Sequence, residues 1–229
     1  MSICKGIIQV VSQNLTDILS SRRSFSEKQD GSYVSEGDLL IQELISSFLD
    51  EHLRSHELIS EELLTHNKAD WNDSGSYIVL DPIDGTENFV SGLKEWGVGI
   101  SIYADGLHEE SCIYLPELDE YLLTGMSITK FSSRIRGLSS SLTKDDLANV
   151  PGGYEYRIMG CSMYNMLSAI KGSFEVFENV KGVNCWDILP GLNLALEHGC
   201  QAEVDGETYH GQMLFPTKRY KIRISDRRK

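Results

Sequence analysis

The run Tyr77-Ile78-Val79-Leu80-Asp81-Pro82-Ile83-Asp84-Gly85-Thr86 carries the pattern on which both the fold and the site depend. Its first four residues form a compact apolar segment typical of a strand, and this strand leads directly into Asp81. Two carboxylates three residues apart, separated by a rigid proline, can converge on one hard cation. Gly85 lets the backbone approach a ligand closely, and a helix beginning near Thr86 would direct free N–H groups at a phosphate. The run therefore predicts a metal and phosphate site where a strand ends.

Two simpler structures, a hairpin turn and a calcium-binding loop, could also contain aspartates and a glycine. A hairpin turn at Asp84-Gly85 would explain those two residues but would leave Asp81, Pro82 and Thr86 as coincidences. An EF-hand calcium loop is excluded, because the acidic residues do not fall at its alternating positions and no glutamate closes the loop. The metal site is the interpretation that accounts for the whole run.

Hydrophobic spacing before and after the run predicts a mixed α/β chain. Residues 3–19 have apolar side chains at helical intervals, so we expect an opening helix. Ser35 followed by Asp38 predicts a capping box at the start of a second helix, over about 38–53. Expected strands lie at 57–60, 77–80, 97–103, 109–115 and 121–124, with a polar loop over 65–76.

The second half is expected to be mixed as well. The Ser/Thr-rich segment 127–143 is the predicted joint between lobes, followed by a helix over 162–170, a strand at 174–177 and a helix over 186–198 that ends at Gly199. We therefore predict one compact catalytic unit, with an N-terminal α+β lobe (1–126) that carries most metal ligands and a C-terminal α/β lobe (127–229).

Composition excludes several classes of function. The net charge of −13 argues against a nucleic-acid partner, because such binding depends on Lys and Arg at phosphates. The basic residues at 219–229 are expected to be a solvated tail. No apolar stretch reaches the roughly 18 residues of a membrane helix, so no membrane association is expected. The five cysteines contain no CxxC pair, which favours reduced thiols and a cytoplasmic location. An acidic protein acting on an acidic phosphate needs a local cation.

The segment from Asp81 to Thr86, followed by Asn88-Phe89, resembles the signature of the inositol monophosphatase family. Three further segments are similar to family motifs in the same order: residues 34–38 to Thr-x-Ala-Asp, 60–62 to Gly-Glu-Glu and 186–187 to Trp-Asp. The resemblance spans roughly residues 28–204. It implies an α/β (α+β) fold, a layered αβαβα sandwich as in inositol monophosphatase and fructose-1,6-bisphosphatase.

The resemblance also implies a set of metal ligands. Glu61, Asp81 and the Ile83 carbonyl would hold one Mg²⁺, and Asp81, Asp84 and Asp187 would hold a second; the family uses a third, weaker ion near Glu61. Physical chemistry favours the same arrangement, because carboxylates gathered in one cleft take up protons unless cations compensate them. We expect two to three Mg²⁺ ions, with Mn²⁺ as a substitute.

Catalytic and substrate-binding roles follow from the resemblance in the same way. Asp38 with Thr86 would position the attacking water, and Glu61 would assist as base. The backbone at Gly85 and Thr86 would cradle the phosphate. Further substrate contacts are implied for Asp84, Gly160, Cys161 and Glu178. The chain departs from the family at Gly37, Ser60 and Tyr77, in a shortened middle segment and in the absence of an evident final helix.

The expected function is Mg²⁺-dependent hydrolysis of a small sugar or cyclitol phosphate, such as inositol monophosphate, by a homodimer. An alternative is a 3′(2′),5′-bisphosphate nucleotidase, although the segment after Gly160 lacks the lysine of that branch and little positive charge is visible. A regulator that binds a phosphorylated ligand without turnover is an alternative of another class. Lithium inhibition is implied by the resemblance alone.

Overall fold

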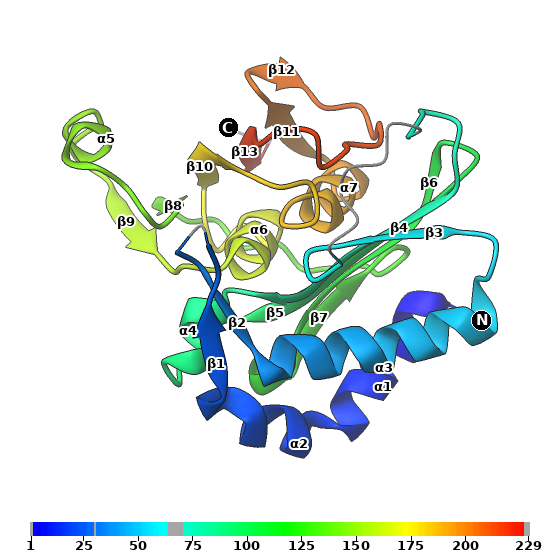
Figure 1. Ribbon diagram of the computed structural model, residues 1–229. Helices are drawn as coiled ribbons and strands as arrows, with labels where there is room; N and C mark the ends of the chain where they lie inside the picture. Colours follow the sequence, from blue (N-terminus) through cyan, green and yellow to red (C-terminus); the bar gives the residue numbers. More distant parts are fainter. Residues whose placement is uncertain (1, 30, 64–70, 227–229) are drawn as a thin grey trace.

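Layers of helices and β-sheets alternate through the molecule (Figure 1). The computed structural model describes residues 2–29, 31–63 and 71–226. Helices α1 (Ile3–Gln13), α2 (Leu15–Ser20) and α3 (Glu36–His52) form the first layer, and α6 (Ser162–Ile170) and α7 (Leu189–Glu197) lie between the two sheets. Two short helices, α4 (Thr86–Val90) and α5 (Lys144–Ala148), lie outside these layers. The expected layered α/β fold is confirmed.

The first sheet has the strand order β3-β4-β5-β6-β7. Its strands are β3 (Glu57–Ser60), β4 (Tyr77–Asp84), β5 (Gly97–Ala104), β6 (Leu107–Leu115) and β7 (Glu120–Leu123). Strands β3 and β4 are parallel, whereas β4 to β7 are antiparallel neighbours and form a meander. A separate antiparallel pair, β1 (Phe25–Glu27) and β2 (Tyr33–Ser35), precedes α3.

Strand β4 is buried along its whole length because both faces of the sheet are covered. Ile78 and Leu80 pack into the core shared with α1 to α3, whereas Tyr77 and Val79 pack into the core shared with α6 and α7. Successive side chains of a strand point to opposite faces, so a continuous apolar run serves two cores at once. This burial fixes the position at which the chain reaches Asp81.

The second sheet has the order β12-β11-β13-β10-β8-β9. Its strands are β8 (Ile135–Leu138), β9 (Glu155–Ile158), β10 (Val176–Val183), β11 (Cys200–Val204), β12 (Glu207–Thr208) and β13 (Tyr220–Asp226). The expectation of a solvated basic tail is wrong, because β13 pairs with both β10 and β11. Tyr220, Ile222 and Ile224 are buried, and the basic residues between them point to the opposite face of the sheet.

Several predicted boundaries move for identifiable reasons. The capping box at Ser35 and Asp38 is present, so the second helix begins near its predicted start. The opening helix is divided at Asn14, whose side chain donates to the Val10 carbonyl. The last predicted helix begins at Leu189, with Pro190 in its first turn, and leaves residues 186–187 in the turn before it. The predicted loop over 65–76 lies partly outside the described residues, at 64–70.

One buried core draws residues from both predicted lobes, including Ile59 and Ile113 from the first sheet and Ile224 from the second. The division into lobes 1–126 and 127–229 therefore remains a prediction about a single packed unit. Across the described residues, none of the helices has the length and apolar character needed to cross a bilayer. All five cysteines are buried, and none of them forms a disulfide.

Candidate metal centre and active site

An irregularity in the pairing of β4 with β5 brings the two aspartates of the central run to one site. Asp81 pairs with Gly99 and Asp84 pairs with Gly97, so three steps along β4 oppose two along β5. In a regular strand, residues three apart point to opposite faces. The extra residue of the bulge reverses one of these directions, and Pro82, which has no N–H for the ladder, lies within it.

Three carboxylates from three segments converge beside this bulge. One oxygen each from Glu61, Asp81 and Asp187 lies within 4.8 Å of the other two. Glu61 follows the end of β3, and its N–H donates to the Leu80 carbonyl at 3.3 Å, which sets it beside Asp81. Asp187 lies in the turn before α7, where its Oδ2 accepts a 2.7 Å hydrogen bond from the Asn184 N–H. The structure thus brings together three of the predicted metal ligands.

Asp81 is the clearest indication that this group fits a cation. Its side chain is fully buried, and within residues 2–29, 31–63 and 71–226 neither carboxylate oxygen has a hydrogen-bond partner. Burial, reinforced by the charges of Glu61 and Asp84, raises the pKa of Asp81 well above its ordinary value. A buried charge without partners is strongly unfavourable unless it is compensated. Four carboxylates and a carbonyl form an all-oxygen donor set of the kind that Mg²⁺ prefers.

Asp84 is held by the N-terminal end of α6. Its Oδ2 accepts hydrogen bonds from the Met163 N–H and from the Cys161 thiol, the latter at 2.9 Å. Burial raises the pKa of Asp84, and these hydrogen bonds oppose the increase. Cys161 also caps α6, because its sulfur accepts from the Tyr164 N–H at 3.3 Å. The predicted substrate residue Cys161 therefore contacts a metal-ligand candidate directly.

Thr86 links the signature run to Asp38. Its Oγ1 lies 3.1 Å from Asp38 Oδ1 and 3.1 Å from the Ile83 carbonyl, so its single proton can go to either acceptor. The other Asp38 oxygen accepts from the Ser35 N–H at 2.8 Å and from the Ser35 hydroxyl at 2.6 Å. Burial raises the pKa of Asp38 to about 6.

The negative charge of Glu61 is compensated by a neighbouring lysine. Lys28 Nζ lies 2.9 Å from Glu61 Oε1 and 2.8 Å from Glu62 Oε1. Burial raises the pKa of Glu61 to about 7, against the opposing effect of the Lys28 charge. A carboxylate with a pKa near neutrality can accept a proton during a reaction at physiological pH.

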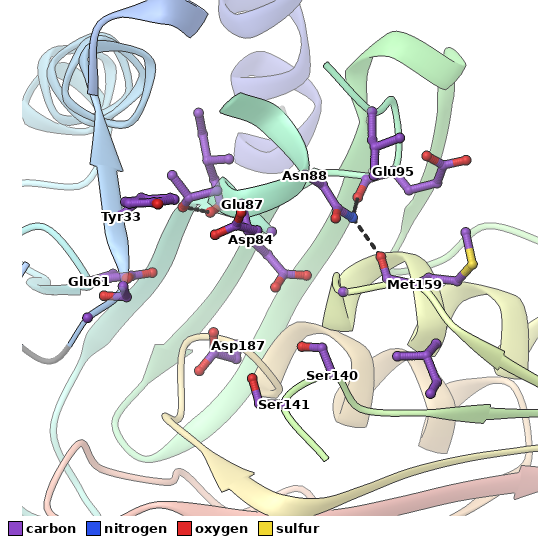
Figure 2. A pocket seen from close by; sticks show the side chains of 18 of the residues that line it. Tyr33, Glu61, Asp84, Glu87, Asn88, Glu95, Ser140, Ser141, Met159 and Asp187 are labelled. Carbon is purple, nitrogen blue, oxygen red and sulfur yellow. Dashed lines mark hydrogen bonds between the residues drawn. The ribbon is translucent and has the colours of Figure 1, made fainter. Parts of the chain in front are cut away.

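The converging carboxylates open into a cavity of about 920 Å³. Figure 2 shows Glu61, Asp84 and Asp187 grouped at one end, and Asn88, Glu95 and Met159 at the other. Asn88 joins the two walls, because its Nδ2 lies 2.6 Å from both the Glu95 and the Met159 carbonyls (Figure 2). A cavity of this size is ample for a small phosphorylated metabolite.

Two glycines at the cavity wall are required by geometry. Gly85 has φ +84°, and a Cβ on it would lie 3.0 Å from the Cys161 Cβ. Gly160 has φ +70°, and a Cβ there would lie 2.9 Å from the Asn88 Oδ1. Left-handed backbone and close approach together exclude larger residues. Both predicted substrate residues line the cavity.

The placement of the predicted site residues divides them into two groups. The structure assembles Asp38, Glu61, Asp81, Ile83, Asp84, Gly85, Thr86, Gly160, Cys161 and Asp187 around one centre. Glu178 is not among the residues that line the cavity; on β10 it forms an ion pair with Arg223 at 3.1 Å. Sequence reasoning missed the lining residues Tyr33, Ser140, Ser141 and Arg219. The alternation of apolar and basic residues over 220–224 was the signal that could have placed Arg219 beside a strand.

Comparison with known proteins agrees with this geometry. The model of the inositol monophosphatase family matches residues 1–130. A relative from Neisseria meningitidis serogroup B named putative Nus factor SuhB is 22% identical over 218 residues, covering 81% of this chain and 77% of the relative. An inositol-1-monophosphatase from Mesorhizobium japonicum is 24% identical over 200 residues, covering 76% and 73%. A solved IMPase/NADP phosphatase, complexed with Mg²⁺ and phosphate, superposes with a TM-score of 0.77 at 20% identity, covering 98% and 89%.

Proposed function

Because this chain belongs to the inositol monophosphatase family, we propose that it is a Mg²⁺-dependent phosphomonoesterase acting on a small sugar or cyclitol phosphate, such as inositol monophosphate. The observation that carries the proposal is the convergence of Glu61, Asp81 and Asp187, with both oxygens of Asp81 buried and without hydrogen-bond partners in the part of the chain that the structure describes. Ligands of this type in a cavity of about 920 Å³ suit the hydrolysis of a small phosphoester.

The residues divide naturally between two ions. Glu61, Asp81 and the Ile83 carbonyl would hold one Mg²⁺, and Asp81, Asp84 and Asp187 a second, with a third ion near Glu61 and Mn²⁺ as a substitute. Bound there, the ions would supply Lewis-acid chemistry, lowering the pKa of a water molecule and stabilising negative charge on the leaving oxygen. The raised pKa values of Asp81 and Asp187 support the assignment, because burial disfavours the ionised carboxylates and a bound cation would compensate their charge.

The protein's own groups position the reactants. The Thr86 hydroxyl, which contacts both Asp38 and the Ile83 carbonyl, would orient the attacking water, and Glu61 would accept its proton. The backbone at Gly85 and Thr86 would hold the phosphate. Cys161 would act through Asp84, because its thiol donates to that carboxylate.

Replacing Asp84 with Asn tests the proposal. We expect phosphate release to fall by at least about 100-fold, because one metal ligand loses its charge while its size is kept. Inositol 1-phosphate, fructose 1,6-bisphosphate and adenosine 3′,5′-bisphosphate form the substrate panel. Asp50→Asn, an exposed site on α3, is the control. Unchanged turnover by the Asp84→Asn variant, with far-UV circular dichroism like the wild type, would contradict the metal assignment.

A second candidate is regulation without turnover, which the name of the Neisseria relative suggests. It predicts no phosphate release from any member of the panel at any Mg²⁺ concentration, although a phosphorylated ligand still binds. Measurable Mg²⁺-dependent turnover would reject it. We also propose a homodimer, to be checked by light scattering coupled to size-exclusion chromatography.

A further inference from the structure

A smaller chamber of about 190 Å³ opens beside the metal centre. It shares Asp84, Asp187 and Arg219 with the main cavity and extends away from it between β8, β10 and the start of α6. Its other walls include the hydroxyl and amide side chains of Ser139, Ser162, Asn165 and Asn179, together with the apolar Phe177 and Val183. The proposed metal ligands do not account for this polarity.

Two polar groups in the chamber have unmet hydrogen-bonding capacity. Ser139 is 6% exposed and Asn165 is 1% exposed, yet the Ser139 hydroxyl and the Asn165 Oδ1 have no hydrogen-bond partner among the described residues. Buried polar atoms are nearly always paired with protein, water or ligand. A chamber with this lining therefore suits a polar occupant rather than an apolar one.

Arg219 determines the sign of the charge that this occupant can carry. It is the one cationic residue among the described residues that line the main cavity, and it also lines the chamber. Lys181 lines the chamber too, but its ammonium lies 2.9 Å from Asp146. Within the described part of the chain, Arg219 has no carboxylate at ion-pair distance. Glu87 and Glu95 on the main cavity wall would repel an anion placed near them.

The backbone is shaped to hold Arg219 in this position. Strand β10 has an irregularity between Asn179 and Val183, where Asn179 Oδ1 accepts from the Lys181 and Gly182 N–H groups, each at 3.1 Å. The turn directs the Gly182 carbonyl at Arg219, whose Nε donates to it at 2.9 Å. Gly182 has φ +82°, and a Cβ on it would lie 3.3 Å from the Arg219 Cβ. One guanidinium edge is thereby fixed, and the two terminal nitrogens are left for a ligand.

We propose that the chamber binds a second anionic group, a phosphate or a carboxylate, on the alcohol part of the substrate, and that Arg219 selects for it. A guanidinium matches the planar oxygen pairs of both groups through charge-assisted hydrogen bonds. Ser139 and Asn165 complete the hydrogen bonds to polar atoms beside the anion. This inference rests on the proposed phosphatase function and narrows its substrate class.

Two matched pairs of substrates test the selection. Fructose 1,6-bisphosphate and fructose 1-phosphate differ in a second phosphate, whereas 2-phosphoglycerate and glycerol 2-phosphate differ in a carboxylate. We expect kcat/KM to be at least about tenfold higher for the doubly anionic member of one pair, mainly through KM. The pair that shows the difference identifies the anion; no difference in either pair overturns the inference.

The variant Arg219→Met should abolish that preference, because its loss of kcat/KM should be at least about tenfold larger for the doubly anionic member than for the singly anionic one. Lys218→Met removes a cation one position away that is paired with Asp205, and it should keep the preference. Equal losses on all four substrates in Arg219→Met, or an unchanged ratio, would overturn the role of Arg219. Should Arg219→Met fail to fold, Arg219→Lys is the second variant. It keeps the positive charge but lacks the paired N–H groups of the guanidinium, so it should retain only part of the preference.

A binding measurement separates this inference from the proposed function. Calorimetry in Ca²⁺ compares fructose 1,6-bisphosphate with fructose 1-phosphate without relying on turnover. Binding of the bisphosphate that is at least about tenfold tighter, and lost in Arg219→Met, supports the chamber even where no substrate is hydrolysed. Equal binding of the two sugars by the wild type, together with equal turnover of both pairs, overturns it whether or not the protein is a phosphatase.

Discussion

Replacing Asp38 with Asn should make the metal-free protein more stable at alkaline pH and should also make it a poor catalyst. Asp38 is fully buried, and burial moves its pKa from an ordinary value of 3.8 to about 6. One pH unit of such a difference corresponds to about 1.4 kcal/mol, so the ionised side chain destabilises the fold by about 3 kcal/mol above pH 6. Asparagine removes this cost.

The hydrogen bonds of Asp38 reduce the expected gain. Its carboxylate accepts from the Ser35 N–H and hydroxyl, and the amide oxygen of Asn can accept the same bonds with less strength. Allowing about 1 kcal/mol for that loss leaves a net gain of about 2 kcal/mol at pH 8. At pH 4 the native carboxyl is protonated, so the variant and the wild type should be nearly equal in stability.

The assay is urea unfolding in EDTA between pH 4 and pH 8, paired with phosphate release in Mg²⁺. The wild type binds more protons when folded than when unfolded in this window, so its stability should fall as pH rises through it, by more than that of the variant. Glu36→Gln, an exposed acid in the same helical turn, is the control and should follow the wild-type slope. Parallel pH slopes for Asp38→Asn and the wild type, or a less stable variant at pH 8, would refute the argument from burial.

Other perturbations have equally definite outcomes. Mg²⁺ at about 100 times its Kd should raise the free energy of unfolding by about 2.7 kcal/mol at pH 8, which corresponds to about 5–10 °C in Tm. The same Mg²⁺ concentration should stabilise the protein less at pH 5, because protons compete for carboxylates whose pKa values are raised. Calorimetry that finds the same rise in Tm at both pH values would contradict this. Gly85→Ala should lower the free energy of unfolding by about 1–3 kcal/mol more than Gly92→Ala, as measured by chemical denaturation. Both glycines have positive φ, but of the two only Gly85 would place a Cβ within 4 Å of a neighbouring atom. Asn193→Leu should lower the free energy of unfolding by about 2–3 kcal/mol in the same assay and leave kcat within twofold, because Asn193 joins Tyr103 and Tyr209 through 2.8 Å hydrogen bonds and is not among the described residues that line the main cavity.

The metal centre was the most predictable part of the structure. Asp81, Asp84 and the strand before them are local in sequence, and the resemblance supplied Glu61 and Asp187 from distant positions. The first sheet was predictable for the same reason, because its strands are long, apolar and joined by short turns. Local pattern and tertiary environment agree in this half of the chain.

The second sheet was harder to predict because its strands are short and partly exposed. Strand β9 has only one residue that is not exposed, and β12 has two residues, both exposed, so neither gives a clear alternation. Strand β13 does alternate, but its basic residues resembled a solvated tail. Arg219 and the serines at 139–141 reach the cavity through tertiary pairing of β13 and β8 with β10, which spacing along the chain does not encode.

Asp81 and Asp84 are an odd number of positions apart, and the bulge in β4 allows both side chains to face the same site. Deleting one residue between them would give a two-residue interval and inserting one a four-residue interval. Either even interval can pair regularly with β5 without a bulge, but it moves Asp84 along the strand away from the Met163 N–H and the Cys161 thiol. Insertions and deletions in this interval are therefore far more damaging than substitutions at Ile83. A library of length variants across residues 82–83 should contain almost no active members, whereas a library of apolar substitutions at Ile83 should contain many.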